Sequence, residues 1–141
     1  MGEKYYIDTC IWRDHYENRF GSQGRPLGKY AAELFLKIMK NKDIIIFSEH
    51  IIHEMKQAFA QEEVEDMFHI LDVMNILQKV EITKADWEEA RNLADERDVS
   101  RADALHAVLA RKHNAILITQ NVKDFKKFSD FLFIKRPEEI I

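Results

Sequence analysis

Cysteine, proline and glycine are scarce in this chain of 141 residues, which has one cysteine, two prolines and four glycines. The single cysteine, Cys10, excludes an internal disulfide and fits the reducing cytosol. The longest aliphatic runs, 44–47 and 115–118, are too short to span a bilayer. The formal net charge of −4 also shows no excess of basic residues, so a polyanionic partner would need a local basic strip or bridging cations.

The N-terminal segment MGEKYYID has no signal-peptide core, and Tyr6 stands where the myristoylation pattern needs serine or threonine. The composition, with 46% hydrophobic and 33% charged residues, is that of an ordinary globular protein. The length suits one domain with a substantial core. We therefore expect a soluble, cytoplasmic protein with a single domain over residues 1–141 and no membrane attachment.

Short apolar segments alternate with helical patterns along the chain. Strands are expected over 5–7, 43–47, 115–119 and 131–134, with 80–83 as a short strand or an extended link. Amphipathic helices are expected over 27–39, 49–59, 62–77, 84–96 and 100–112. Ser48 can cap the second of these helices, and Thr83 and Asp86 predict a capping box at the start of the fourth. Residues 13–29 hold three of the four glycines and predict a long loop, or a frayed helix and a loop. The alternation predicts an α/β fold, a three-layer α/β/α domain with a short central parallel sheet.

A carboxylate interrupts the bulky apolar stretch YYIDTCIW at Asp8. A charge inside such a run is costly unless it is neutralised, so either Asp8 caps a turn or it belongs to a site that uses its charge. In open parallel sheets, ligands bind beyond the carboxyl ends of the strands. Asp8 follows the first strand at that end, and Asn121 and Asp124 follow the strand 115–119 there. These side chains are candidates for one site.

Two further acids fall near the same edge. Glu54 lies in the second turn of the helix that follows the strand 43–47, where it could also be a partly solvated helix residue. Asp103 lies in the first turn of its helix, where it could complete a capping box with Ser100. The apolar sequence ALHAVLA that follows favours a half-buried carboxylate instead. Asp124, for its part, could simply cap the helix in DFKKF.

The grouping of these acids indicates a cation-binding site. Two carboxylates about 5 Å apart repel by roughly 3 kcal/mol at an effective dielectric constant of 20. A cluster of three or four is therefore stable only with protons or cations among them. An all-oxygen site favours Mg²⁺ or Mn²⁺ over zinc.

Four sequence blocks occur in an order and spacing that resemble the PIN-domain family of metal-dependent ribonucleases. They are YYIDT at the first strand, SEHIIHEM with Glu54, SRADALHAVLARKHNAILIT with Asp103, and TQNVKDF after the 115–119 strand. Each block is loose by itself, but the ordered set covers nearly the whole chain and is fairly specific.

The resemblance implies an endoribonuclease that hydrolyses phosphodiester bonds of RNA with Mg²⁺ or Mn²⁺. It implies Asp8 and Asp103 as catalytic residues and direct metal ligands, with Glu54 as a ligand or a base that orients water. The family's frequent acid after the threonine of the last block falls on Asn121, whereas Asp124 matches a second frequently acidic position. We therefore expect Asn121 or Asp124 as a further ligand, with one ion held firmly and another only with substrate.

An anionic site that binds RNA needs basic and hydroxyl side chains at its rim. The substrate-binding candidates are Thr9, Arg13, Thr119 and Lys123. Each basic residue could equally be an ordinary solvated one. Further basic candidates in the same segments are Arg19, Arg25, Lys29, Lys126 and Lys127.

The partners and the biological role stay open between alternatives. Many relatives in the resembled family are toxins blocked by a small antitoxin protein, and others are standalone RNA-processing nucleases. A non-catalytic binding module is a third reading. The apolar helices 27–39 and 62–77 could form a homodimer or antitoxin surface, although core packing explains them equally well.

Two other motifs fail on inspection. GRPLGKY (24–30) has three residues between its glycines where a phosphate-binding P-loop has four, and Tyr30 replaces the serine or threonine that holds Mg²⁺. HEMKQ (53–57) begins like a zinc-protease helix but has Gln57 in place of the second histidine. We therefore expect the histidines at 50, 53 and 106 to be packing or surface residues, not zinc ligands.

Overall fold

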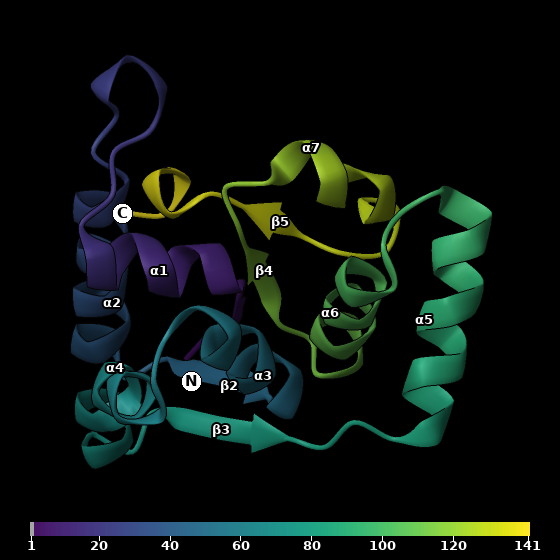
Figure 1. Cartoon of the computed structure of the whole chain (residues 1–141), viewed down its shortest axis with the longest axis horizontal. Coiled ribbons are helices and arrows are strands. Elements are labelled where there is room, and N and C mark those ends of the chain that lie inside the picture. The colour runs from purple at the N-terminus through teal and green to yellow at the C-terminus, as the bar shows by residue number, and fades with distance from the viewer. Residues whose placement is uncertain (1) are drawn as a thin grey trace.

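Five parallel strands form the centre of the fold (Figure 1). A computed structural model describes residues 2–141 of the chain. The spatial order of the strands is β3-β2-β1-β4-β5. Their bounds are Lys4–Ile7 for β1, Ile44–Ser48 for β2, Leu77–Val80 for β3, Ile116–Ile118 for β4 and Ile134–Lys135 for β5. The predicted three-layer α/β/α fold with a short parallel sheet is confirmed.

The first strand of the chain is the central strand of the sheet. Tyr5 of β1 pairs with Ile45 of β2 on one side and with Ile116 of β4 on the other. Strands covered on both faces are continuously apolar, and the side chains of Tyr6, Ile46 and Leu117 are fully buried accordingly. The chain moves outward in one direction from β1 to β3 and in the other from β4 to β5, so the switch point lies between β1 and β4.

Four helices connect the first three strands. They are α1 (Thr9–Glu17), α2 (Leu27–Asn41), α3 (Glu49–Ala58) and α4 (Gln61–Val73), with a short 3-10 helix, η1 (Ser22–Gly24), before α2. Right-handed crossovers place these helices on one face of the sheet. Trp12 of α1 stacks against Phe35 of α2 and Phe68 of α4, with ring centroids 5.0 and 4.2 Å apart, so aromatic packing joins the layer.

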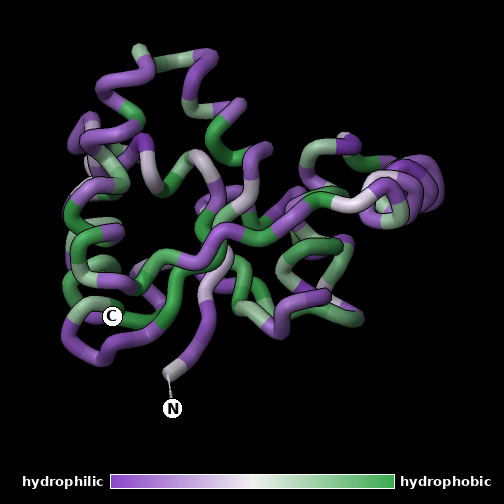
Figure 2. Tube along the Cα trace, turned by 90° about the horizontal axis from the view of Figure 1, so that it is seen from below, coloured by the Kyte–Doolittle hydropathy of each residue, from purple (hydrophilic) through white to green (hydrophobic). Residues whose placement is uncertain are grey.

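The opposite face carries the later helices, α5 (Lys84–Arg97), α6 (Arg101–Lys112) and α7 (Val122–Phe125), and the 3-10 helix η2 (Lys126–Phe128). Helix α6 packs against β1 and β4, and its central residues from Ala104 to Ala110 are all buried. Helix α5 packs mainly on α6 and lies at the outer end of the domain, where Figure 2 shows it as mostly hydrophilic. A last 3-10 helix, η3 (Pro137–Glu139), contacts α2.

Several element boundaries differ from those predicted. Residues 13–17 belong to helix α1, so the glycine-rich loop is shorter than expected. Helix α4 ends at Val73 and not near 77, because Leu77 already pairs with Ile45 as the first residue of β3. The last strand is Ile134–Lys135 and not 131–134, which leaves Phe133 77% exposed. Apolar character alone does not give strand register, and these boundaries were wrong for that reason.

The predicted capping box at Thr83 is confirmed. Its hydroxyl accepts a hydrogen bond from the Asp86 amide, and the Asp86 carboxylate accepts one from the Thr83 amide. None of the helices in residues 2–141 is both long and apolar enough to cross a membrane.

Candidate metal-binding site at the carboxyl edge of the sheet

Asp8 comes directly after β1 and begins helix α1 as its N-cap residue. Its side chain is buried, yet three donors point at it. The Thr9 amide lies 2.8 Å from Oδ1, and the Thr119 hydroxyl and the Cys10 thiol lie 2.8 and 3.3 Å from Oδ2. The Asp8 carboxylate therefore caps helix α1 and is also held in one orientation at the end of the central strand.

Thr9 links Asp8 to Glu54. Its amide donates to Asp8, and its hydroxyl donates to Oε1 of Glu54 over 2.7 Å. Glu54 is on α3, which begins directly after β2, so two neighbouring strand ends deliver the two acids to the same edge. The predicted partial burial of Glu54 is what the structure has, with its side chain 27% exposed.

Glu54 also ends a chain of buried hydrogen bonds. Its Oε1 lies 2.9 Å from Nε2 of His106, whose Nδ1 lies 2.7 Å from the Tyr6 hydroxyl, which in turn lies 2.9 Å from the Ser48 hydroxyl. Ser48 precedes α3, but its hydroxyl bonds Tyr6 and does not cap the helix as the sequence predicted. We call Ser48, Tyr6, His106 and Glu54 the buried relay.

The charges of the buried relay are coupled. Burial would raise the pKa of Glu54, but hydrogen bonds from His106 and Thr9 and the nearby histidine charges lower it overall. Burial would lower the pKa of His106, but its bond to Glu54 and the negative charges of Asp8, Glu54 and Asp103 raise it overall. Glu54 is therefore ionised at neutral pH and held by the hydrogen bonds from His106 and Thr9.

Asp103 lies in the first turn of α6, half-buried, and its backbone amide donates a hydrogen bond to the Ser100 hydroxyl, which caps the helix. Burial raises the pKa of the Asp103 carboxyl, and the negative charges of Asp8 and Asp124 raise it further. Asp103 and Asp124 line one pocket of about 280 Å³ with Ser100 and Lys127. We call Asp8, Asp103 and Asp124 the acidic group, because the negative charges of Asp8 and Asp124 both raise the pKa of Asp103.

The acidic group has no basic partner of its own. Among residues 2–141, no lysine, arginine or histidine nitrogen lies within 4.0 Å of a carboxylate oxygen of Asp8, Asp103 or Asp124. Other carboxylates of the chain are paired in this way, for example Asp86 with Lys112 at 3.2 Å. Asp8, Asp103 and Asp124 thus offer only oxygen ligands, and none of the three forms a direct ion pair among residues 2–141.

The remaining predicted site residues have different surroundings. Asn121 is exposed at the start of α7, and its amide donates to the Thr119 hydroxyl over 2.9 Å. Thr119 itself is completely buried, and its hydroxyl donates a hydrogen bond to Asp8. This position allows Thr119 to orient the Asp8 carboxylate but keeps it from contacting a substrate. Arg13 pairs with Glu17 at 3.4 Å, whereas Lys123 is exposed beside Asp124 in the sequence.

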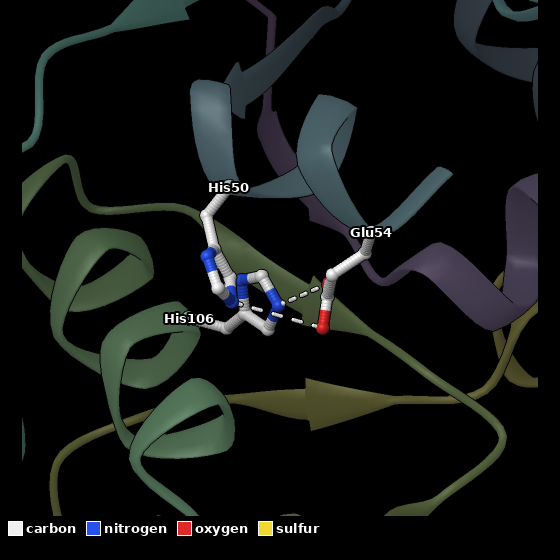
Figure 3. A group of neighbouring side chains, drawn as sticks. All are labelled: His50, Glu54 and His106. Atoms are coloured by element: carbon white, nitrogen blue, oxygen red, sulfur yellow. Dashed lines mark hydrogen bonds and ion pairs between the residues drawn. The ribbon is translucent and has the colours of Figure 1, made fainter. Parts of the chain in front are cut away.

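A second set of side chains meets more closely than the acids do (Figure 3). His50, Glu54 and His106, which we call the histidine group, each offer one ligand atom, and these atoms lie within 4.8 Å of one another. It is the one such set of three among residues 2–141. From the sequence alone, His50 and His106 were expected to be packing or surface residues. His106 is a lone polar side chain inside the apolar run ALHAVLA, and that isolation is the one signal in the sequence for its buried contacts.

Comparisons with known proteins agree with this fold. The family model for the PIN domain matches residues 5–130. The chain therefore belongs to the PIN domain family. No curated protein matches the sequence.

Several solved structures share the fold at low identity. One is VapBC2 from Rickettsia felis bound to a DNA fragment from its promoter, at 19% identity and a TM-score of 0.66, over 94% of this chain and 98% of that one. Another is VapBC-1 from nontypeable Haemophilus influenzae, at 22% identity and a TM-score of 0.63, over 96% and 98%. FitAcB from Neisseria gonorrhoeae has 12% identity and a TM-score of 0.62, over 95% and 98%.

Proposed function

We propose that this protein is a metal-dependent endoribonuclease that hydrolyses phosphodiester bonds of RNA with Mg²⁺ or Mn²⁺. The observation that carries the proposal is the acidic group. The charges of Asp8 and Asp124 raise the pKa of Asp103 near the edge where a parallel sheet binds ligands, and no basic side chain of residues 2–141 forms an ion pair with the three. The membership of the PIN domain family supports the same conclusion.

The residues present fit a hard divalent cation. Every donor of the acidic group is a carboxylate oxygen, and Asn121 adds an amide oxygen at the same edge. Oxygen ligands of this kind suit Mg²⁺ and Mn²⁺. We assign Asp8 and Asp103 as direct ligands, Asp124 or Asn121 as a further one, and Glu54 as a ligand or a base that orients water.

The chain's own residues prepare the site for reaction. When bound, the metal would lower the pKa of a water and stabilise the negative charge that develops on the phosphate. Thr119, Cys10 and the Thr9 amide hold Asp8 in one orientation, so no side-chain freedom has to be lost when a ligand binds. The buried relay keeps Glu54 ionised and aimed at the same edge, where it can accept a proton from water.

The RNA would be held at the rim of this edge. We propose that Lys123 and Arg13 contact phosphates, since both lie on elements that begin beside the acids. Thr9 remains a substrate-binding candidate, although its hydroxyl already donates to Glu54. For Thr119 we propose a positioning role toward Asp8 in place of substrate binding.

The biological role that we favour is that of a toxin in a toxin–antitoxin pair. Similar structures include VapBC-1 from Haemophilus influenzae and a toxin–antitoxin complex from Klebsiella pneumoniae. We accordingly propose a small antitoxin protein as a partner, and a homodimer as the assembly. This role also places the protein in the cytoplasm, where Cys10 stays reduced and transcripts are accessible.

The test is RNA cleavage by the purified full chain with Mg²⁺ or Mn²⁺, with EDTA, and with Asp8→Asn. Asparagine is as good an N-cap as aspartate, so the variant keeps α1 while losing the charge. We expect EDTA and the variant each to abolish cleavage, whereas Asp95→Asn, on the exposed face of α5, leaves it unchanged. Cleavage that survives both EDTA and Asp8→Asn would overturn the proposal.

The two alternative roles predict other results. A non-catalytic binding module would bind RNA or protein without producing new 5′-phosphate ends under any metal. A standalone processing nuclease would cleave but would have no antitoxin gene directly upstream, and its expression would not arrest growth. Sequencing the 5′-phosphate ends that accumulate on expression would also identify the RNA that is cut.

A further inference from the structure

The histidine group has an arrangement that its role in the buried relay does not explain. His106 bonds Glu54 and Tyr6 through its two ring nitrogens, but His50 takes no part in the relay. Its Nε2 is shielded from solvent and has no hydrogen-bond partner among residues 2–141. That atom lies 3.8 Å from Oε2 of Glu54, too far for a hydrogen bond but directed at the same carboxylate. Figure 3 shows both imidazoles converging on Glu54 from α3 and α6.

The spacing of these atoms suits a borderline metal ion. Zinc binds histidine nitrogen and carboxylate oxygen at about 2.0–2.2 Å, so ligand atoms around a tetrahedral ion lie about 3.4 Å apart. Here Nε2 of His106 lies 2.9 Å from Oε1 of Glu54, and Nε2 of His50 lies 3.8 Å from Oε2 of the same carboxylate. One ligand atom from each of the three residues lies within 4.8 Å of the others, so side-chain rotations would be needed to bring them onto one ion. Two nitrogens and one oxygen with an open fourth position is a donor set typical of Zn²⁺.

The surroundings support ligand roles for both histidines. A metal-bound histidine usually donates its second nitrogen to a fixed acceptor, and Nδ1 of His106 has the Tyr6 hydroxyl at 2.7 Å for this purpose. Tyr6 can then donate onward to Ser48. The ring of His50 lies edge-on to Trp87 of α5, with centroids 5.6 Å apart, which restricts its orientation.

We propose that His50, Glu54 and His106 form a second metal site, selective for Zn²⁺ and similar ions over Mg²⁺. It differs from the acidic group in its donors, since nitrogen ligands exclude a firm magnesium site. Glu54 is shared with the proposed nuclease site, in which we assign it as a ligand or a base that orients water. On the basis of the proposed nuclease activity, zinc bound here takes Glu54 away from that role and slows cleavage.

The binding test uses the full-length protein without a histidine tag, titrated with Zn²⁺ by calorimetry and with Co²⁺ by visible absorption. Four-coordinate Co²⁺ gives strong visible bands, whereas a cysteine ligand adds a separate sulfur-to-metal band in the near ultraviolet. We expect one ion per chain, visible Co²⁺ bands that Zn²⁺ removes, and no sulfur band, which rules out Cys10. His50→Gln should weaken zinc binding by at least about a hundredfold, because it removes a direct ligand.

His53→Gln is the matched control. His53 is the same residue type on the same helix, three positions away and exposed, so its loss should leave the affinity for zinc unchanged. Equal weakening by both variants would overturn the proposal, as would a magnesium affinity equal to that for zinc. Tyr6→Phe gives a second measure that does not depend on His50, with an expected loss of about tenfold in zinc affinity.

Asp103→Asn separates this proposal from the proposed function. It removes an acid of the acidic group and leaves all three ligands in place, so the Co²⁺ bands should persist. Loss of the bands in Asp103→Asn would place the ion among the acids and overturn the second site. If the protein cleaves no RNA at all, the zinc titration still decides the second site, because its readout is binding.

Discussion

The acidic group and the histidine group lie at the same edge of the sheet but deal with negative charge in opposite ways. In the histidine group, Glu54 is neutralised by its surroundings, with His106 at 2.9 Å and the Thr9 hydroxyl at 2.7 Å. In the acidic group, Asp103 faces the charges of Asp8 and Asp124, and its pKa is raised. Glu54 is therefore stabilised by the protein alone, whereas the ionised form of Asp103 is disfavoured until a cation or a proton joins it.

This difference predicts which substitutions separate stability from function. Removing an acid from the acidic group should relieve repulsion and cost activity. Removing a member of the buried relay should cost both stability and activity. The following predictions test that contrast, beginning with the largest expected effect.

Asp103→Asn should lower the rate of RNA cleavage by at least about a hundredfold, because it removes a direct ligand of the metal site that we propose. In EDTA the same variant should melt at a higher temperature than the wild type, since a half-buried charge with a raised pKa is lost. Mn²⁺ should raise the melting temperature of the wild type and not that of the variant. Equal shifts with Mn²⁺ would argue against Asp103 as a ligand.

The pH dependence of that stability difference has a definite sign. The folded protein holds the pKa of Asp103 above the unfolded value of about 3.9, so the folded state binds the proton more tightly. The wild type should therefore lose its disadvantage as the pH falls through the raised pKa, and the two proteins should be equally stable below about pH 3.9. Denaturant unfolding in EDTA at a series of pH values measures this.

Tyr6→Phe should destabilise the protein by about 1–3 kcal/mol, because buried His106 and Ser48 each lose a hydrogen-bond partner. Cleavage should fall by about tenfold, through kcat and not KM, since Glu54 loses its support and the RNA contacts remain. The matched control is Tyr16→Phe, because the exposed Tyr16 hydroxyl bonds only Glu63 on the surface. A Tyr6→Phe protein with wild-type kcat would remove the buried relay from the mechanism.

Asn121→Asp should strengthen the acidic group as a metal site. It places a carboxylate where the family often has one, so we expect a larger Mn²⁺-induced rise in melting temperature and tighter binding of a second ion. In EDTA it should destabilise the protein slightly, by added repulsion. An unchanged Mn²⁺ response would leave Asp124 as the residue that completes the site.

Lys123→Ala should have the smallest effect, a rise in KM of about threefold and a decrease of about one in the slope of log affinity against log salt concentration. Lys84→Ala, an exposed lysine at the start of α5, is the control and should change neither. A loss that does not depend on salt concentration would mean that Lys123 supports α7 and does not contact phosphate.

The amino-acid sequence was sufficient for the architecture and for the position of the acids. The alternation of apolar segments and helical patterns predicted the parallel sheet, and a carboxylate directly after an apolar strand pointed to its carboxyl edge. The capping box at Thr83 was readable because its hydrogen bonds are local. The end of α4 and the start of β5 could not be predicted in this way, because they are set by strand pairing with residues far away in the sequence.

The buried relay shows why part of the site could not be predicted from the sequence. Its hydrogen bonds join Tyr6 to Ser48 and His106, which are 42 and 100 positions away. Ser48 was taken for a helix cap, since that use depends only on neighbours in the sequence. Packing between α3 and α6 decides whether a buried histidine contacts an acid, a tyrosine or neither. The hydrophobic periodicity of the sequence carries no information about that contact.

The position of β1 in the sheet has a consequence for how the molecule is made. Tyr5 pairs with Ile45 on one side and with Ile116, a much later residue, on the other. During synthesis β1 can pair with β2 before β4 has been made, so its other edge stays open until β4 emerges. Asp8 and Asp103 are separated by a similar length of chain, so the acidic group cannot assemble before α6 has been made. For the nuclease that we propose, this order of assembly would keep the site incomplete until the later elements have folded.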